Sequence, residues 1–159
     1  MDDGNLGETL AQQYAALPYM VRDGELQVLL VTSRRTHRWI IPKGWPEKGL
    51  KGSQVAAREA FEEAGVVGKV AGKRIARFEY IKRIDDARTQ PCRVSVYPLA
   101  VEQILDEWPE KHQRQREWMT PGQAAMRVSE AGLIQLMLDL TDFGETPENP
   151  KIPAKIRFR

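Results

Sequence analysis

Residues 44–66 read GWPEKGLKGSQVAAREAFEEAGV, and this stretch decides how the whole chain is interpreted. Glu59, Glu62 and Glu63 stand at positions i, i+3 and i+4, which on a helix fall within about 100° of arc. Each pair of like charges on such a face costs a helix a few tenths of a kcal/mol. A hard divalent cation, which prefers carboxylate oxygens, would turn that cost into a gain.

The residues around the glutamates predict a helix over Gln54–Ala64. Ser53 is a good N-cap, and Gly65 suits a left-handed residue just beyond the helix end. The side opposite the glutamates is expected to pack against the rest of the protein and contains Ala57, Ala60, Phe61 and Ala64. One face of the helix therefore packs while the other presents acid to solvent or to a ligand.

Composition predicts one soluble globular domain over residues 1–159. The chain is 42% hydrophobic and 29% charged, and 159 residues are enough for a substantial core. Residues 1–13 and 146–159 are expected to be peripheral tails. The net charge of +2 does not favour a nucleic-acid partner, and the short basic tail Lys155–Arg159 is the one feature that points to such a partner.

Cysteine and histidine are too few for most protein metal sites. Cys92 is the only cysteine, which excludes an intramolecular disulfide and a thiolate zinc cage. His37 and His112 cannot supply a histidine-rich site, so any metal must be held by oxygen. No signal segment and no apolar run of membrane-spanning length is present, so we expect a cytoplasmic protein without a membrane partner.

Apolar runs predict a series of strands and helices around this segment. Leu26–Thr32 is almost continuously apolar, as expected of a strand covered on both faces. Residues 102–114 are too polar and irregular to be expected in the core. We expect further strands at 15–20, 39–41, 74–83, 93–101 and 117–119, and helices at 121–127 and 133–140.

The glutamate segment resembles the Nudix box. That pattern runs Gly, five residues, Glu, seven residues, then Arg-Glu-aliphatic-x-Glu-Glu-x-Gly-aliphatic. Gly44 matches the first glycine, and Arg58, Glu59, Glu62, Glu63, Gly65 and Val66 match the rest at the right distances. The resemblance covers about residues 14 to 143, and the Pro42-Lys43-Gly44 entry is most similar to the diphosphoinositol-polyphosphate and dinucleoside-polyphosphate hydrolases of that superfamily.

The resemblance implies a fold, a reaction and a set of site residues. The fold would be an α/β/α sandwich with a mixed β-sheet between helices. The reaction would be hydrolysis of a phosphoanhydride (pyrophosphate) bond that depends on Mg²⁺ or Mn²⁺. Glu59, Glu62 and Glu63 would hold the metal, with Gly44 offering its carbonyl, and Arg58 would orient the glutamates, since Arg58 and Glu62 form an i, i+4 pair.

Leu50 departs from the family pattern, because it stands where the family has its isolated glutamate. Glu47 lies three positions earlier and is a weak substitute. The departure leaves open a second interpretation, a catalytically weak or inactive Nudix-like module that binds a nucleotide or phosphorylated metabolite for regulation. The three intact glutamates oppose that interpretation. The number of metal ions, the general base and the oligomeric state, including a homodimer, stay open.

Basic residues near the box indicate a small-molecule polyphosphate as substrate. Arginine suits phosphate by bidentate contact and lysine as a point charge. The candidates for binding phosphate are Lys43, Arg34, Arg35 and Arg38, followed by Lys82 and Arg83 at the end of a strand. Each of the arginines could equally belong to a solvated loop. Glu79 and Asp85-Asp86 are candidates for an additional carboxylate from outside the box.

Overall fold

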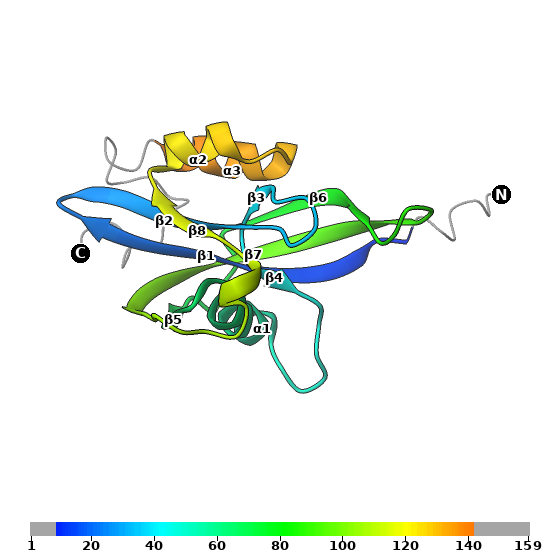
Figure 1. The fold of residues 1–159 in the computed structure, drawn as a ribbon, viewed down its shortest axis with the longest axis horizontal. Helices are drawn as coiled ribbons and strands as arrows, with labels where there is room; N and C mark the ends of the chain where they lie inside the picture. Colours follow the sequence, from blue (N-terminus) through cyan, green and yellow to red (C-terminus); the bar gives the residue numbers. More distant parts are fainter. Residues whose placement is uncertain (1–8, 142–159) are drawn as a thin grey trace.

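The computed structural model describes residues 9–141, which form a mixed sheet between two helical layers (Figure 1). The elements are β1 (Ala11–Arg22), β2 (Glu25–Thr32), β3 (Trp39–Ile40), β4 (Lys43–Gly44), α1 (Gly52–Glu59), η2 (Ala60–Ala64, a π-helix), β5 (Val66–Val70), β6 (Ala76–Arg83), β7 (Thr89–Ile104), η3 (Lys111–Gln113, a 3₁₀ helix), β8 (Arg116–Met119), α2 (Pro121–Arg127) and α3 (Ala131–Leu140). The expected C-terminal tail at 146–159 lies outside the described residues. The expected N-terminal tail is too long, because β1 begins at Ala11.

The described part of the chain contains one eight-stranded sheet. Its order is β3-β2-β1-β7-β5, with β4 beside β1, β6 beside β7 and β8 beside β2. The central strands β1 and β7 are parallel, with Ala11 opposite Cys92 and Tyr19 opposite Ala100. The other pairs of named strands are antiparallel. The expectation of a mixed sheet is therefore confirmed.

The helices cover opposite faces of the sheet, with α2 and α3 on one side and α1 on the other (Figure 1). Successive side chains of a strand point to opposite faces. Accordingly, Val28 and Leu30 pack in the core beneath α2 and α3, whereas Leu29 and Val31 pack in the core beneath α1. The continuous apolar run of β2 is explained by this double coverage, as predicted.

The glutamate helix begins earlier than predicted. Its N-cap is Lys51, whose backbone N–H donates to Gln54 Oε1 at 2.7 Å, so Ser53 lies inside the helix. The packing face is also shifted. Ala56, Ala60 and Ala64 are fully buried at a four-residue spacing, while Phe61 is 38% exposed, so the prediction that Phe61 packs inward was wrong.

Strand segments that lie beyond the ends of the predicted strands include β4, β5 and the last residues of β7. β5 follows the glutamate helix directly and pairs with the far end of β7, which continues to Ile104 through residues expected to be irregular. A bulge between Val67 and Gly68 interrupts this pairing, and a Cβ on Gly68 would lie 1.9 Å from the Ala100 carbonyl oxygen. In residues 9–141 no helix has the length and apolar character needed to cross a bilayer. Location in the cytoplasm stays a prediction.

Candidate functional site

A cavity of about 330 Å³ lies between the β2–β3 loop, β4, β6 and the end of the glutamate helix. Among its described lining residues, the basic side chains are Arg34, Arg35, Lys43, Lys82, Arg83 and Arg114, and the carboxylates are Glu59, Glu63 and Glu110. Gly44 and the buried Gln13 also contribute to the wall. The cavity lining therefore has more basic than acidic side chains, and its acidic side chains come from the glutamate helix and from Glu110.

Glu59 lies directly over Gly44. A Cβ built on Gly44 would stand 2.6 Å from both Cδ and Oε2 of Glu59, so only glycine leaves room for this carboxylate. Burial raises the pKa of Glu59, while contact with the Glu63 carboxyl and the charge of Arg58 lower it. The first glycine of the motif thus provides the space in which the Glu59 side chain rests.

Glu63 is the most deeply buried acid of the site, with a residue exposure of 6%. Burial raises its pKa to about 8, while the nearby Arg114 acts in the opposite direction. Its Oε2 lies 3.5 Å from Arg114, but its Oε1 is buried and has no hydrogen-bond partner among the described residues. A buried polar atom of this kind is expensive to leave unpaired, and its presence calls for a partner that a ligand can supply.

Glu62 is not part of the cavity lining. Residues 60–64 form a π-helical turn, which is wider than an α-helical turn. Glu59 and Glu63, four residues apart, both line the cavity, whereas Glu62 does not, although its charge helps to raise the pKa of Glu59. Across residues 9–141, no group of three histidine, cysteine or acidic side chains is already arranged to hold a metal.

A divalent cation nevertheless fits the pair that does meet. Glu59 and Glu63 supply hard oxygen donors, burial raises the pKa of both, and Glu63 Oε1 is unpaired within the described part of the chain. Mg²⁺ is commonly held by only one or two carboxylates and keeps several waters. The two carboxylates are thus compatible with such an ion.

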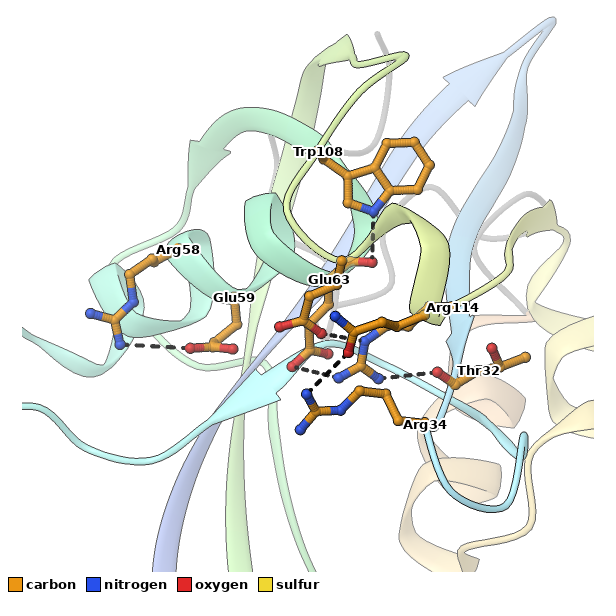
Figure 2. Close-up of polar contacts among 9 residues, drawn as sticks. Thr32, Arg34, Arg58, Glu59, Glu63, Trp108 and Arg114 are labelled. Carbon is orange, nitrogen blue, oxygen red and sulfur yellow. Dashed lines mark hydrogen bonds and ion pairs between the residues drawn. The ribbon is translucent and has the colours of Figure 1, made fainter.

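Arg58 does not pair with Glu62 as expected. Its Nη1 lies 2.5 Å from Glu47 Oε1 and its Nη2 lies 3.6 Å from Glu59 Oε2 (Figure 2 shows Arg58 beside Glu59). Glu47 and Glu59 raise the pKa of Arg58, Glu47 most strongly through its hydrogen bond. The guanidinium therefore links the loop before the helix to the first glutamate.

Arg114 is a site residue that sequence reasoning missed. Its side chain is only 7% exposed, and it contacts Glu63 at 3.5 Å, Glu110 Oε1 at 2.7 Å and the Thr32 carbonyl at 3.0 Å (Figure 2). Glu110 lines the cavity as well. The one local signal was the i, i+4 spacing of Glu110 and Arg114, in a segment expected to be outside the core.

The other candidate carboxylates lie elsewhere. Glu79 forms an ion pair with Arg93 at 3.1 Å between β6 and β7. Asp85 pairs with Arg88 at 2.7 Å in the β6–β7 turn. Neither they nor Asp86 line the cavity, so the carboxylate from outside the box that does so is Glu110.

Lys43 is the most distinctive basic group of the cavity. Burial lowers its pKa, with Glu130 and Glu63 acting in the opposite direction. Its Nζ lies 5.1 Å from the centroid of the Tyr80 ring, and among the described residues it makes no ion pair within 4.0 Å. This ammonium group is available to an anionic ligand.

The predicted arginines divide into two groups. Arg34 and Arg35 line the cavity and are anchored by Gln113 Oε1 at 3.3 Å and the Ile84 carbonyl at 3.4 Å, respectively. Arg38 does not line it, because it turns towards Ser129 and Glu130 at the start of α3. Lys82 and Arg83, at the end of β6, do reach the cavity.

Comparison with known proteins gives concordant results. "Nudix hydrolase 18, mitochondrial" of Arabidopsis thaliana is 32% identical over 120 residues, covering 71% of this chain and 66% of that protein. "Diphosphoinositol polyphosphate phosphohydrolase 3-beta" of Bos taurus is 40% identical over 97 residues, covering 59% of this chain and 55% of that protein. The matched part thus spans between half and two thirds of the length of these relatives.

Solved structures show the same fold. The C. elegans Ap4A hydrolase superposes with a TM-score of 0.60 at 18% identity, covering 85% of this chain and 98% of that one. The NUDIX domain of Shewanella oneidensis NrtR, complexed with ADP ribose, has a TM-score of 0.59 at 16% identity and covers 86% of this chain and 90% of that one. The family model for the NUDIX domain matches residues 12–137. Because that match takes in most of the chain, including the motif and both central strands, the protein belongs to the Nudix family.

Proposed function

We propose that this protein is a divalent-cation-dependent pyrophosphohydrolase that cleaves a phosphoanhydride bond in a polyphosphorylated small molecule. The observation that carries the proposal is the pair of half-buried Glu59 and buried Glu63, with its unpaired Glu63 oxygen, on the wall of a cavity lined by basic side chains. Acid alone would repel a polyphosphate. Acid that holds a cation, surrounded by arginine and lysine, would attract one.

Glu59 and Glu63 would hold Mg²⁺ or Mn²⁺, with Glu62 and the Gly44 carbonyl as further donors from the motif. Such a cation, when bound, neutralises charge on phosphate oxygens and lowers the pKa of water. Arg58 would keep Glu59 in place through the contact at 3.6 Å. One of the carboxylates would serve as general base.

The basic side chains would bind the phosphate groups of the substrate. Lys43 offers an ammonium group inside the cavity, and Arg34 and Arg35 offer guanidinium groups at its rim. Arg38 points away towards Glu130 and would act only if the β2–β3 loop moved. Several cations around one cavity suit a ligand with several phosphates better than a ligand with one.

Two substrate classes are proposed, diphosphoinositol polyphosphates and dinucleoside polyphosphates. The first is supported by sequence relatives whose names describe that activity, and the second by the resemblance of the motif. A second candidate function is a module that binds a nucleotide or phosphorylated metabolite for regulation. Leu50, which replaces the family's isolated glutamate, is the observation that favours it.

Phosphate release from a substrate panel tests the proposal. The panel contains diphosphoinositol polyphosphates, dinucleoside polyphosphates, ADP-ribose and nucleoside triphosphates, each with Mg²⁺ or Mn²⁺. We expect wild type to turn over at least one of the first two classes, and Glu63→Gln to lose at least about 100-fold in kcat. Glu79→Gln, which removes a paired carboxylate away from the cavity, is the matched control and should behave as wild type.

Two results would contradict the proposal. Absence of turnover by wild type across the panel would favour the binding module, and equilibrium binding of the same compounds would then identify its ligand. Turnover that Glu63→Gln leaves unchanged would exclude the metal assignment.

A further inference from the structure

The end of the glutamate helix is held by a single distant segment, residues 105–116. The last carbonyls of a helix have no partner within the helix and must find one elsewhere. Here four consecutive carbonyls accept hydrogen bonds from that segment: Glu62 from Glu110 N (3.0 Å), Glu63 from Trp108 Nε1 (3.2 Å), Ala64 from Arg116 Nη1 (2.9 Å) and Gly65 from Leu105 N (2.8 Å). The segment replaces the hydrogen bonds that a continuing helix would have formed.

The side chains of Trp108 and Arg116 stack on each other within this segment. The Arg116 guanidinium carbon lies 3.8 Å from the centroid of the Trp108 ring, and its Nη2 donates to the Leu105 carbonyl at 2.7 Å. Both side chains close over Gly65. A Cβ there would stand 2.5 Å from Trp108 and 2.7 Å from Arg116. The ring is therefore held by stacking with Arg116 and by its hydrogen bond to the helix end.

The same segment also holds the carboxylate of Glu63. Arg114 contacts Glu63 Oε2 at 3.5 Å, while the Trp108 indole N–H donates to the carbonyl of the same residue (Figure 2). Residues 105–116 thus contact Glu63 at both its backbone and its side chain. These contacts lie at the π-helical turn, a rare conformation that surrounding contacts must maintain.

Trp108 is not among the residues that line the cavity, whereas Glu63, Glu110 and Arg114 are. An effect of Trp108 on turnover must therefore pass through Glu63 or its neighbours. We propose that Trp108 is a positioning residue, whose N–H fixes the Glu63 backbone so that its carboxylate is presented to the cation; this inference rests on the proposed function.

The substitution Trp108→Phe tests the proposal because it removes the indole N–H and keeps an aromatic ring for Arg116. We expect kcat to fall about tenfold, the Mn²⁺ dissociation constant to rise about three- to tenfold, and KM to change less than about twofold. A purely structural role would lower the melting temperature without this split between kcat and KM. Metal affinity is measured by electron paramagnetic resonance of Mn²⁺, which needs no turnover.

Trp39→Phe is the matched control. Trp39 also carries an arginine over its ring, with Arg127 at 5.7 Å from the centroid, but it is partly buried and packs against the core under α2 and α3. Its loss of an indole N–H should leave kcat and Mn²⁺ affinity unchanged. Should Trp108→Phe fold poorly, 3-benzothienylalanine incorporated at position 108 serves instead, because it keeps the bicyclic ring and replaces only the N–H by sulfur, so the hydrogen bond to Glu63 is lost.

The outcomes separate this inference from the proposed function. Inactive wild type that still binds Mn²⁺ contradicts the proposed reaction, and Mn²⁺ affinity alone then decides the role of Trp108. Wild type that binds no Mn²⁺ overturns both. Wild-type values of kcat and Mn²⁺ affinity in folded Trp108→Phe overturn the positioning role and leave the proposed reaction intact.

Discussion

The Arg58 guanidinium lies 2.5 Å from the Glu47 carboxylate, so the loop between β4 and α1 is attached to the glutamate helix. Glu47 stands three residues before Leu50, the position at which the family has its isolated glutamate. The loop thus supplies the Glu47 carboxylate to Arg58, although position 50 itself carries no carboxylate. This contact joins the loop to Glu59, because Arg58 reaches both acids.

Replacing Glu47 should affect catalysis more than stability. The side chains of Glu47 and Arg58 are 56% and 32% exposed, and a pair of that kind contributes at most about 1 kcal/mol to the free energy of unfolding. In Glu47→Gln, Arg58 loses its closest anion, so we expect kcat to fall about three- to tenfold. Urea denaturation and steady-state kinetics measure both effects. Glu117→Gln, another exposed carboxylate paired with an arginine, should change neither.

Replacing Gly44 should displace Glu59. In Gly44→Ala the new methyl group would lie 2.6 Å from the Glu59 carboxyl, which must move out of the cavity wall. We expect at least about a 100-fold loss of kcat/KM, since a small displacement of a catalytic group is costly. Gly72→Ala is the control, because its new methyl group would have no described atom within 4 Å. Equal activity of the two variants would contradict the role assigned to Gly44.

The stability of the metal-free protein should fall as the pH rises. Burial raises the pKa of Glu63 from 4.5 to about 8, so between these values the folded state holds a proton that the unfolded state has released. The free energy of unfolding therefore decreases across that interval and levels off above it. Melting temperatures of wild type and Glu63→Gln, recorded in EDTA from pH 5 to pH 8.5, isolate this contribution as their difference.

Saturating Mg²⁺ provides the complementary measurement for Glu63. A bound cation favours the ionised carboxylate, so the added metal should raise the melting temperature more at pH 8 than at pH 5. If wild type gained stability relative to Glu63→Gln on going from pH 5 to pH 8 in EDTA, the assignment of a raised pKa to Glu63 would be wrong.

Removing the Lys43 charge should weaken substrate binding without destabilising the protein. Burial lowers the pKa of Lys43, which means that the ammonium group is poorly solvated. In Lys43→Met that cost disappears, so the melting temperature should stay or rise, while KM should increase about tenfold or more through loss of a charged contact to phosphate. Lys48→Met changes an exposed lysine of the following loop and serves as the control. An unchanged KM would exclude phosphate binding by Lys43.

Arg114 should be needed for the fold as well as for the site. At pH 8.5, where Glu63 is ionised despite its raised pKa, Arg114→Met leaves the carboxylates of Glu63 and Glu110 without their shared cation, and breaking a buried pair in this way costs about 3–5 kcal/mol. The double variant Arg114→Met/Glu63→Gln should recover part of that loss, because one of the two charges is gone. Urea denaturation of the four proteins gives the coupling energy, and purely additive effects would argue against the contact.

Much of the fold could be predicted because its elements have short-range patterns. The apolar run of β2, the glutamate helix and α3 are each recognisable within a dozen residues, and the structure confirms them. β5 was missed because VVGKV is short, contains Gly68 and acquires its strand character only by pairing with β7. Strand character of that kind depends on a partner about thirty residues away rather than on local sequence.

The site was predictable only as far as the motif extends. Lys43, Gly44, Glu59 and Glu63 meet in the cavity as local spacing suggested. The π-helical turn at residues 60–64 and the absence of Glu62 from the cavity lining have no signal in the spacing, which assumed an ordinary helix. The place of Arg114 in the site could not be predicted either, because its contacts with Glu63 and Thr32 join segments about fifty or more residues apart and its surroundings lack periodicity.

The parallel pairing of β1 with β7 has a consequence for how the chain folds. It joins residues about eighty positions apart. The entropy cost of closing so long a loop is incurred before the contacts between the two strands can offset it. We therefore expect high contact order and slow refolding, with the β1–β2 hairpin forming early as a local unit. The glutamate helix lies between the two central strands in sequence. Its acidic end is completed only by residues that follow β7, so catalytic competence should be the last property to appear in a refolding experiment.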